Sequence, residues 1–280
     1  MDTITLWEFV ALAGAATLVG FSKTAVSGAN TVSLAVFAAV LPARESTGVL
    51  LPLLIVGDVF AVYTYRRHAD WTTLVRLFPA VAAGVVAGTV FMLWADDAAV
   101  RTSIGAILLL MAGVTVWRRR AAAKAQKAQK AQKAGEAGEA GKAGEARKAG
   151  DVGKEAGERQ GGARLKAGSY GVLGGFTTMV ANAGGPVMSL YLLSAGFRKL
   201  GFLGTSAWFF LIVNVAKVPF SVGLGLIDGH SLLLDAGLAL FVVPGAFLGK
   251  AVLDRINQRL FEQLVLAATL LGGLQLLLRG

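Results

Sequence analysis

Three charged residues lie in or beside long apolar stretches of this 280-residue chain, and their types suit them to chemistry. Lys23 follows an apolar run in GFSKTAVSGAN, Asp58 lies within LLPLLIVGDVFAVYTY, and Lys217 lies within WFFLIVNVAKVPFSVGLG. If these stretches cross a membrane, a charge at mid-bilayer costs about 3 kcal/mol even on a lenient insertion scale. We therefore expect Asp58 and Lys217 to face the protein interior or a water-filled cavity. There a lysine can hold an anion, and an aspartate can take up and release a proton.

Each of these residues also has a purely structural interpretation, which stays open at this stage. Asp58 could form an ion pair with Lys217 or with Lys23 that only holds helices together. Lys23 could instead end a helix and extend its ammonium group to the membrane surface.

Two glycine-rich turns join short apolar segments and offer hydrogen-bond donors to a ligand. The first is GFSKTAVSGAN and the second is TTMVANAGGPVMS. A helix broken inside a membrane exposes backbone N–H groups at its new N-terminus, and these groups favour an anion. Glycine permits the close approach that such a site needs, and proline suits the first turn of the next helix. The predicted anion-binding residues are Lys23, Ser27, Gly28, Asn30, Thr178, Asn182, Gly184, Gly185 and Pro186.

The composition indicates a polytopic membrane protein. Hydrophobic residues make up 55% of the chain and charged residues 16%, whereas a soluble domain carries about 25% charged residues. The 36 glycines fit this class, because glycine lets transmembrane helices approach closely. The chain has no cysteine and two histidines, His68 and His230, which argues against a metal site. We expect no cofactor.

The apolar segments form two groups of five, separated by a basic linker. We place them at 6–20, 27–41, 48–65, 74–94 and 99–117, and again at 168–181, 185–197, 204–226, 232–249 and 260–278. A full span needs about 20 apolar residues, so the last three segments of each group are long enough and the first two are short. The organisation is therefore a membrane repeat at 1–117, a linker at 118–166 and a second membrane repeat at 167–280.

The two halves share a register when the numbering is shifted by 156. This shift aligns Ala25 with Ala181 and later places Asp58 on Asn214, a chemically close pair. Because each half has an odd number of segments, the second half starts on the opposite side of the membrane from the first. The halves should therefore have inverted topology. We predict an all-α polytopic membrane protein of two inverted repeats, each starting with short, paired or re-entrant segments. Asp58, Asn214 and Lys217 are the predicted coupling or gating residues.

The linker sets the predicted orientation. It holds 14 basic and 6 acidic residues in low-complexity Lys-Ala-Gln and Ala-Gly-Glu units, and basic loops favour the cytoplasmic side. With the linker in the cytoplasm, 65–71 is also cytoplasmic and both termini lie outside. We expect the linker to contact anionic lipid and not nucleic acid, because no aromatic residue interrupts it to stack on bases. The oligomeric state stays open.

These features favour a transporter of a small anion. An anion channel would use similar groups, and a proton or cation exchanger would depend on Asp58 alone. An enzyme is disfavoured, because Asp58 is the one carboxylate that we place inside a span and the spans contain neither cysteine nor histidine.

The second half contains a stretch, 174–220, that resembles the signature of the TauE/SafE family of sulfite and organosulfonate exporters. The similar features are the turn ANAGGP, the Gly-Thr pair in FLGTSAW and the run NVAKVP. The first half resembles the family through GFSKTAVSG and GVLLPLLIVGDVFAVYTYRRHADW. The resemblance implies a multi-pass transporter of the bacterial inner membrane. We expect it to export sulfite, an organosulfonate or a related sulfur-containing or carboxylate anion, coupled to protons.

Overall fold

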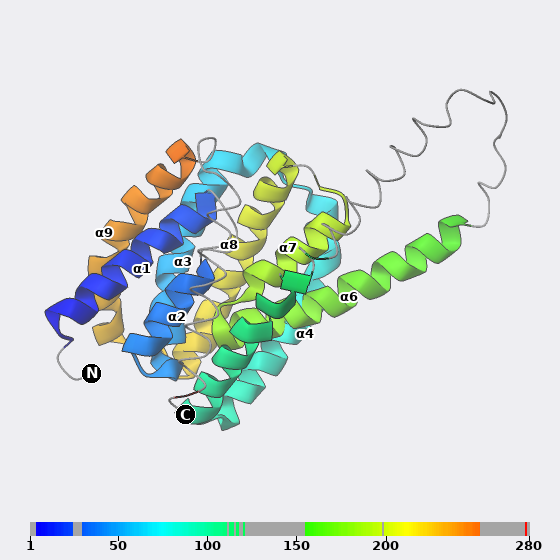
Figure 1. Ribbon diagram of the computed structural model, residues 1–280. Coiled ribbons are helices and arrows are strands. Elements are labelled where there is room, and N and C mark those ends of the chain that lie inside the picture. The colour runs from blue at the N-terminus through cyan, green and yellow to red at the C-terminus, as the bar shows by residue number, and fades with distance from the viewer. Residues whose placement is uncertain are drawn as a thin grey trace.

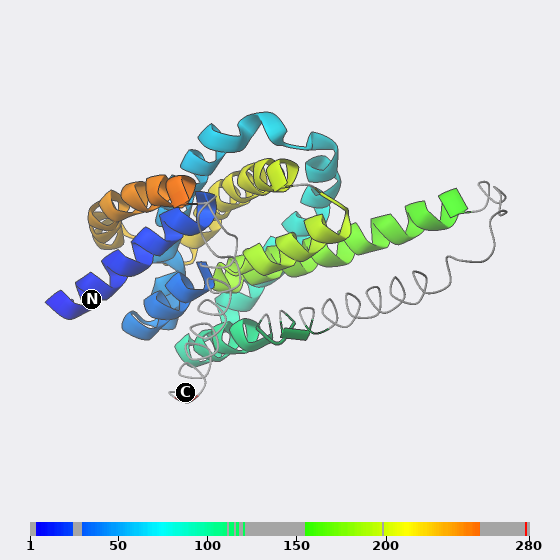
Figure 2. The same cartoon turned by 45° about the horizontal axis from the view of Figure 1, so that its top comes forward.

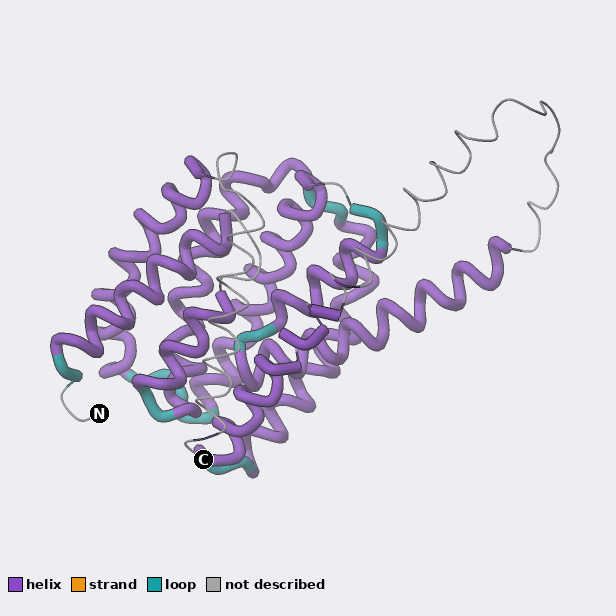
Figure 3. The backbone as a smooth tube through the Cα atoms, viewed as in Figure 1, coloured by secondary structure: helices purple, strands orange, loops and turns teal. Residues whose placement is uncertain are grey.

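The computed structural model describes residues 4–24, 30–110, 112–114, 116–117, 120, 155–197, 199–252 and 278. Every regular element in these ranges is a helix, and short loops join them (Figures 1 and 3). The elements are α1 (Leu6–Thr24), α2 (Asn30–Val40), α3 (Ala43–Tyr65), the 3-10 turn η1 (Arg66–His68), α4 (Trp71–Trp94), α6 (Glu155–Ala181), α7 (Gly184–Ser194), α8 (Lys199–Gly223) and α9 (Gly229–Val252). A further helix covers Asp97–Val114.

Six described helices are long and apolar enough to cross a membrane. They are Leu6–Thr24, Ala43–His68, Trp71–Trp94, Asp97–Val114, Leu200–Gly223 and Gly229–Ala251. Several leave large apolar side chains exposed, such as Trp94 on α4 and Leu240 on α9, as expected where a helix faces lipid. The prediction of an all-α polytopic membrane protein is confirmed.

The helices pair across the two halves of the chain through close backbone contacts. Figures 1 and 2 show α1 beside α9 and α4 beside α6, and α3 packs against α8. Glycines allow the approach, because a Cβ atom on one of them would collide with a backbone oxygen of the neighbouring helix. The colliding pairs are Gly20 with Val242, Gly245 with Thr17, Gly84 with Val172, and Gly175 with Val81. The same kind of contact thus recurs in α1–α9 and in α6–α4.

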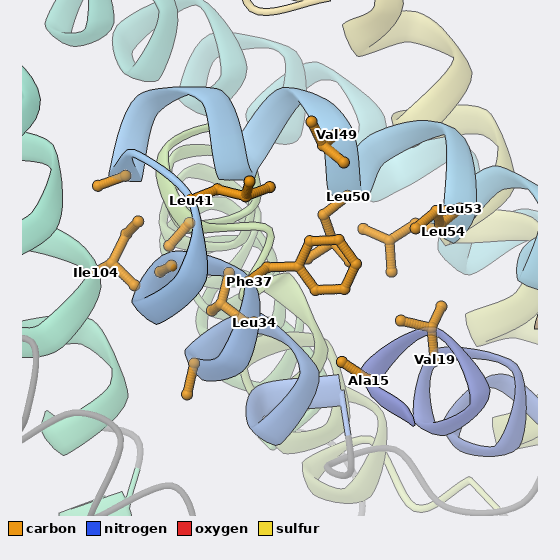
Figure 4. Close-up of a cluster of buried hydrophobic side chains, with 14 of the residues drawn as sticks. Ala15, Val19, Leu34, Phe37, Leu41, Val49, Leu50, Leu53, Leu54 and Ile104 are labelled. Carbon is orange, nitrogen blue, oxygen red and sulfur yellow. The ribbon is translucent and has the colours of Figure 1, made fainter. Parts of the chain in front are cut away.

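The short helix α2 lies inside the bundle. Its Leu34 and Phe37 are fully buried among side chains of α1, α3 and the Asp97–Val114 helix, including Val19, Leu50 and Ile104 (Figure 4). The 11 residues of α2 are too few to cross a bilayer, and this packing covers their apolar surface instead. α7, also of 11 residues, occupies the corresponding place after α6.

Several helix bounds differ from those expected from apolarity. α1 continues to Thr24, because Gly20 is a contact glycine against α9 and does not end the helix. α3 begins at Ala43, directly after Pro42, and α4 begins at Trp71, where the Asp70 carboxylate caps the helix by accepting from the Thr73 N–H at 2.8 Å. A cap and good helix formers extend a helix beyond its apolar part. Each half therefore opens with a long helix and a short one, and not with two short ones.

The expected boundary at residue 167 falls inside α6. This helix begins at Glu155 and extends away from the bundle before its second part packs on α4 (Figure 1). The last 12 residues of the expected linker are thus helical, whereas 121–154 lie outside the described residues, as does the expected last segment, 260–278, except for Leu278.

Candidate functional site

A cavity lies where the ends of α1 and α6, the starts of α2 and α7, and the middles of α3 and α8 meet. Its volume is about 40 Å³. One water needs about 10–15 Å³ on this measure, so the cavity has room for about three waters or one small anion. Lys23, Asn30, Asp58, Thr178, Asn182 and Asn214 supply most of its polar lining, while Leu34, Leu54 and Phe210 are among its apolar lining residues.

Lys23 and Asp58 form a buried ion pair on the cavity wall. The Lys23 Nζ atom lies 2.6 Å from Asp58 Oδ1, and the two side chains are 10% and 0% exposed. Asn214 Nδ2 donates to the other carboxylate oxygen, Oδ2, at 2.7 Å. The Lys23 ammonium group also lies 4.6 Å from the centre of the Phe210 ring, a cation–π contact. The ammonium group of Lys23 thus points inward to Asp58, although the residue is in the last turn of α1.

Lys217 is bound differently, because its hydrogen bonds hold the turn between α6 and α7. Its Nζ atom donates to the Thr178 carbonyl and to Asn182 Oδ1, both at 2.6 Å, and has a longer contact of 3.4 Å to Asn214 Oδ1. An ammonium group has three N–H donors, so these partners satisfy it. Lys217 is buried and does not line the cavity, where its positive charge still acts from behind the Asn214 and Asn182 amides.

Asn182 connects the two turns identified in the sequence. It has a positive φ of 50°, a conformation that asparagine tolerates better than most residues, and it ends α6 by donating its N–H to the Thr178 carbonyl. Its side-chain Nδ2 donates to the Thr47 carbonyl at 2.9 Å. Its own carbonyl accepts from Asn30 Nδ2 at 3.4 Å. The two turns therefore approach each other at Asn30 and Asn182.

The structure gathers most of the predicted site residues at this cavity. Gly185 and Pro186, in the first turn of α7, line it directly. Gly184 does not, because it packs on Thr178, whose Cβ would lie 2.9 Å from a Cβ added at Gly184. Ser27 and Gly28 lie outside the described residues.

The polar lining residues Ser22, Thr31 and Ser206, the aromatic lining residue Phe210 and one buried carboxylate were not predicted from the sequence. Ser22 lies 156 residues before the predicted site residue Thr178, so the repeat register could have found it, whereas Phe210 lies 156 residues after Leu54, which was not predicted either. Ser206 had no such signal. Asp235 is a second buried carboxylate within a span, in α9, and was overlooked inside the apolar segment 232–249.

The charges around the cavity favour a negatively charged ligand. Among the described residues, two lysines and one carboxylate border it or lie directly behind it, so one positive charge is in excess when all three are ionised. The N-terminus of α7 adds partial positive charge from its free N–H groups. The described residues contain no group of three or more His, Cys, Asp or Glu side chains that could hold a metal ion.

Comparison with known proteins gives one match, to the profile of a protein family. No curated protein and no solved structure matches the chain. The sequence profile of one family, described as sulfite exporter TauE/SafE, matches residues 12–276, which is nearly the whole chain. That match includes both glycine-rich turns and all three charged residues of the site. The chain belongs to the TauE/SafE family of sulfite exporters.

Proposed function

We propose that this protein is a secondary transporter that exports a small anion across the bacterial inner membrane, coupled to protons. The substrate class is sulfite, an organosulfonate or a related sulfur-containing or carboxylate anion. The observation that carries the proposal is the cavity at the junction of the two helix breaks, where Lys23 and Asp58 form an ion pair and Lys217 lies behind the wall, so that one positive charge is in excess when all three are ionised. The family description supports the transport of sulfur oxyanions.

The roles of the residues follow from their contacts. Lys23 reaches the cavity with its ammonium group and is the cation that would meet the anion directly. Asn30, Thr178 and Asn182 would add neutral hydrogen bonds, and the α7 N-terminus would add its free N–H groups. Asp58 is the group that would carry the proton, because it is the carboxylate in contact with that lysine.

The repeat register supports a site on a symmetry axis between inverted repeats. Four pairs of lining residues are 156 residues apart, namely Ser22 and Thr178, Asn30 and Pro186, Leu54 and Phe210, and Asp58 and Asn214. Members of the last pair are hydrogen-bonded to each other. Residues at equivalent positions touch only near the axis that relates their repeats. Transporters with inverted repeats bind substrate at this place, near the bilayer midplane.

The proposed orientation places the 118–166 linker and the 65–71 loop in the cytoplasm and both termini outside. Its support is the clustering of Lys and Arg in these segments. Anionic lipid headgroups are the proposed partner of the basic linker.

The proposal is tested with purified protein in two steps. A thermal-shift screen of sulfite, sulfate, thiosulfate, sulfoacetate, taurine and short carboxylates identifies which anions bind. Counterflow in proteoliposomes then uses a binding anion. With the membrane potential held at zero by valinomycin and equal potassium on both sides, vesicles filled with unlabelled anion should transiently concentrate the labelled anion from outside, which a carrier does and a channel does not. A lack of binding by every anion in the screen would contradict the proposal.

A further inference from the structure

We propose that the anion and a proton bind this site together, with the anion replacing Asp58 as the partner of Lys23 while Asp58 takes up the proton. The inference rests on the proposed function and adds whether anion binding and protonation favour or oppose each other. It predicts that each event favours the other, so that the two ions travel in the same direction and export is driven by the outward gradient of the anion, which carries the proton out with it.

The geometry makes Lys23 a shared partner. Its ammonium group contacts the cavity, the Asp58 carboxylate at 2.6 Å and the Phe210 ring. Lys217 cannot take this role, because oxygens of Thr178, Asn182 and Asn214 already accept its N–H groups. An incoming anion and the Asp58 carboxylate therefore compete for one cation.

When the anion takes Lys23, no other nearby cation in the described part of the chain is free to pair with the Asp58 carboxylate. Asp58 can then lose its negative charge only by taking up a proton. Among the described side chains, Lys23 on α1 and Lys217 on α8 are the cations that act on the Asp58 carboxylate. α2 has no charged residue. The other described charged side chains on elements packed against α3 are Glu8 on α1, Asp235 and Lys250 on α9, and Arg66, Arg67 and His68 in η1. None of these acts on Asp58 at short range.

The protonated state keeps a hydrogen bond. The proton would go to Oδ1, the oxygen that faces Lys23 and has no other partner among the described residues. Asn214 Nδ2 can continue to donate to Oδ2, which stays an acceptor in the neutral acid. One monoanion and one proton arrive, and the charge of the site is unchanged. Transport of a monoanion by this cycle is electroneutral.

The test uses methanesulfonate and sulfate, because their charges are constant between pH 5 and pH 8. Binding to the purified protein is measured by calorimetry in two buffers of different ionisation enthalpy, which gives the protons taken up with each anion. We expect about one proton per anion, and an affinity that rises up to tenfold for each unit decrease in pH while Asp58 is ionised in the free protein. Asp58→Asn should bind with an affinity that is independent of pH and with no proton uptake. Asp228→Asn, at an exposed loop carboxylate, should behave like the parent protein.

The outcomes separate the inference from the function on which it rests. Binding that is measurable, independent of pH and without proton uptake in the parent protein overturns the inference and leaves the proposed function standing. Proton uptake that persists in Asp58→Asn also overturns it, since another group would then carry the proton. If neither anion binds at any pH, the proposed site for sulfur oxyanions is itself contradicted, and the inference falls with it.

Discussion

Lys23 could bind the anion, or it could serve only as the structural ion-pair partner of Asp58. Variants that remove its charge can distinguish the two roles. At 2.6 Å the attraction between Lys23 and Asp58 is about 6 kcal/mol at an effective dielectric constant of about 20. Among the described residues, Lys23→Ala leaves the fully buried Asp58 carboxylate with only Asn214 as a close partner. Breaking a buried pair on one side costs about 3–5 kcal/mol of stability. The single variant should therefore lose stability whichever role Lys23 has, so it cannot decide between them.

The double variant Lys23→Ala/Asp58→Asn makes the distinction. It removes both charges, and an amide at position 58 can still accept from Asn214, so thermal unfolding in detergent should return to within a few degrees of the parent protein. Anion binding should not return. Loss of a full charge from a dry site should weaken binding by about 2 kcal/mol or more relative to Asp58→Asn alone, which is about 30-fold in Kd.

Calorimetry and thermal unfolding on the three variants provide the assay, with Lys250→Ala as the control at an exposed lysine of α9. The control should match the parent protein in both measurements. If the double variant binds the anion as tightly as Asp58→Asn, Lys23 is only a structural partner for Asp58 and the reasoning is refuted.

Three further predictions concern the scaffold of the site and are checked by thermal unfolding. Lys217→Met should destabilise the protein by about 1–3 kcal/mol, because the buried Asn182 Oδ1 loses its donor while the Thr178 carbonyl keeps the Asn182 N–H; equal stability would show that the turn does not need this lysine. Asn182→Gly should retain the positive φ but lose the Lys217 contact, so it should be more stable than Asn182→Ala by about 1–2 kcal/mol; the reverse order would contradict a left-handed residue here. Gly175→Val should separate α6 from α4 and cost about 1–3 kcal/mol, whereas Gly237→Ala, inside α9 where an added Cβ meets no atom within 4 Å, should be neutral or stabilise the protein by up to about 1 kcal/mol; a loss of stability at both positions would contradict the close α4–α6 contact.

The sequence predicted which residues gather but not how they pair. The cost of charge in a membrane indicated that Asp58 has a partner, yet both lysines were equally acceptable from sequence. The choice depends on where α1 and α8 place their ammonium groups, which is a property of the packed helices. Asn182 is a similar case, because nothing local distinguishes an asparagine that carries a positive φ and binds three partners from one that only lines a turn.

Helix ends were harder to predict than helix identity. The first apolar segment was expected to end at residue 20, but the lack of a side chain at Gly20 serves the contact with Val242 on α9 and the helix continues through Lys23. A glycine that permits close packing and one that ends a helix look the same in a single sequence. The repeat register predicted more, since Asp58 and Asn214, 156 residues apart, proved to be hydrogen-bonded.

Occupation of the cavity by the anion during transport can be tested by cysteine protection. The chain has no native cysteine, so Ser206→Cys places the one thiol of the protein in the cavity wall, and Asp228→Cys places it on an exposed loop. We expect a saturating transported anion to slow the reaction of a methanethiosulfonate reagent at Ser206→Cys and not at Asp228→Cys, and the modified Ser206→Cys protein to lose counterflow. Equal labelling rates with and without the anion, together with counterflow that survives modification at Ser206→Cys, would contradict occupation of the cavity by the anion.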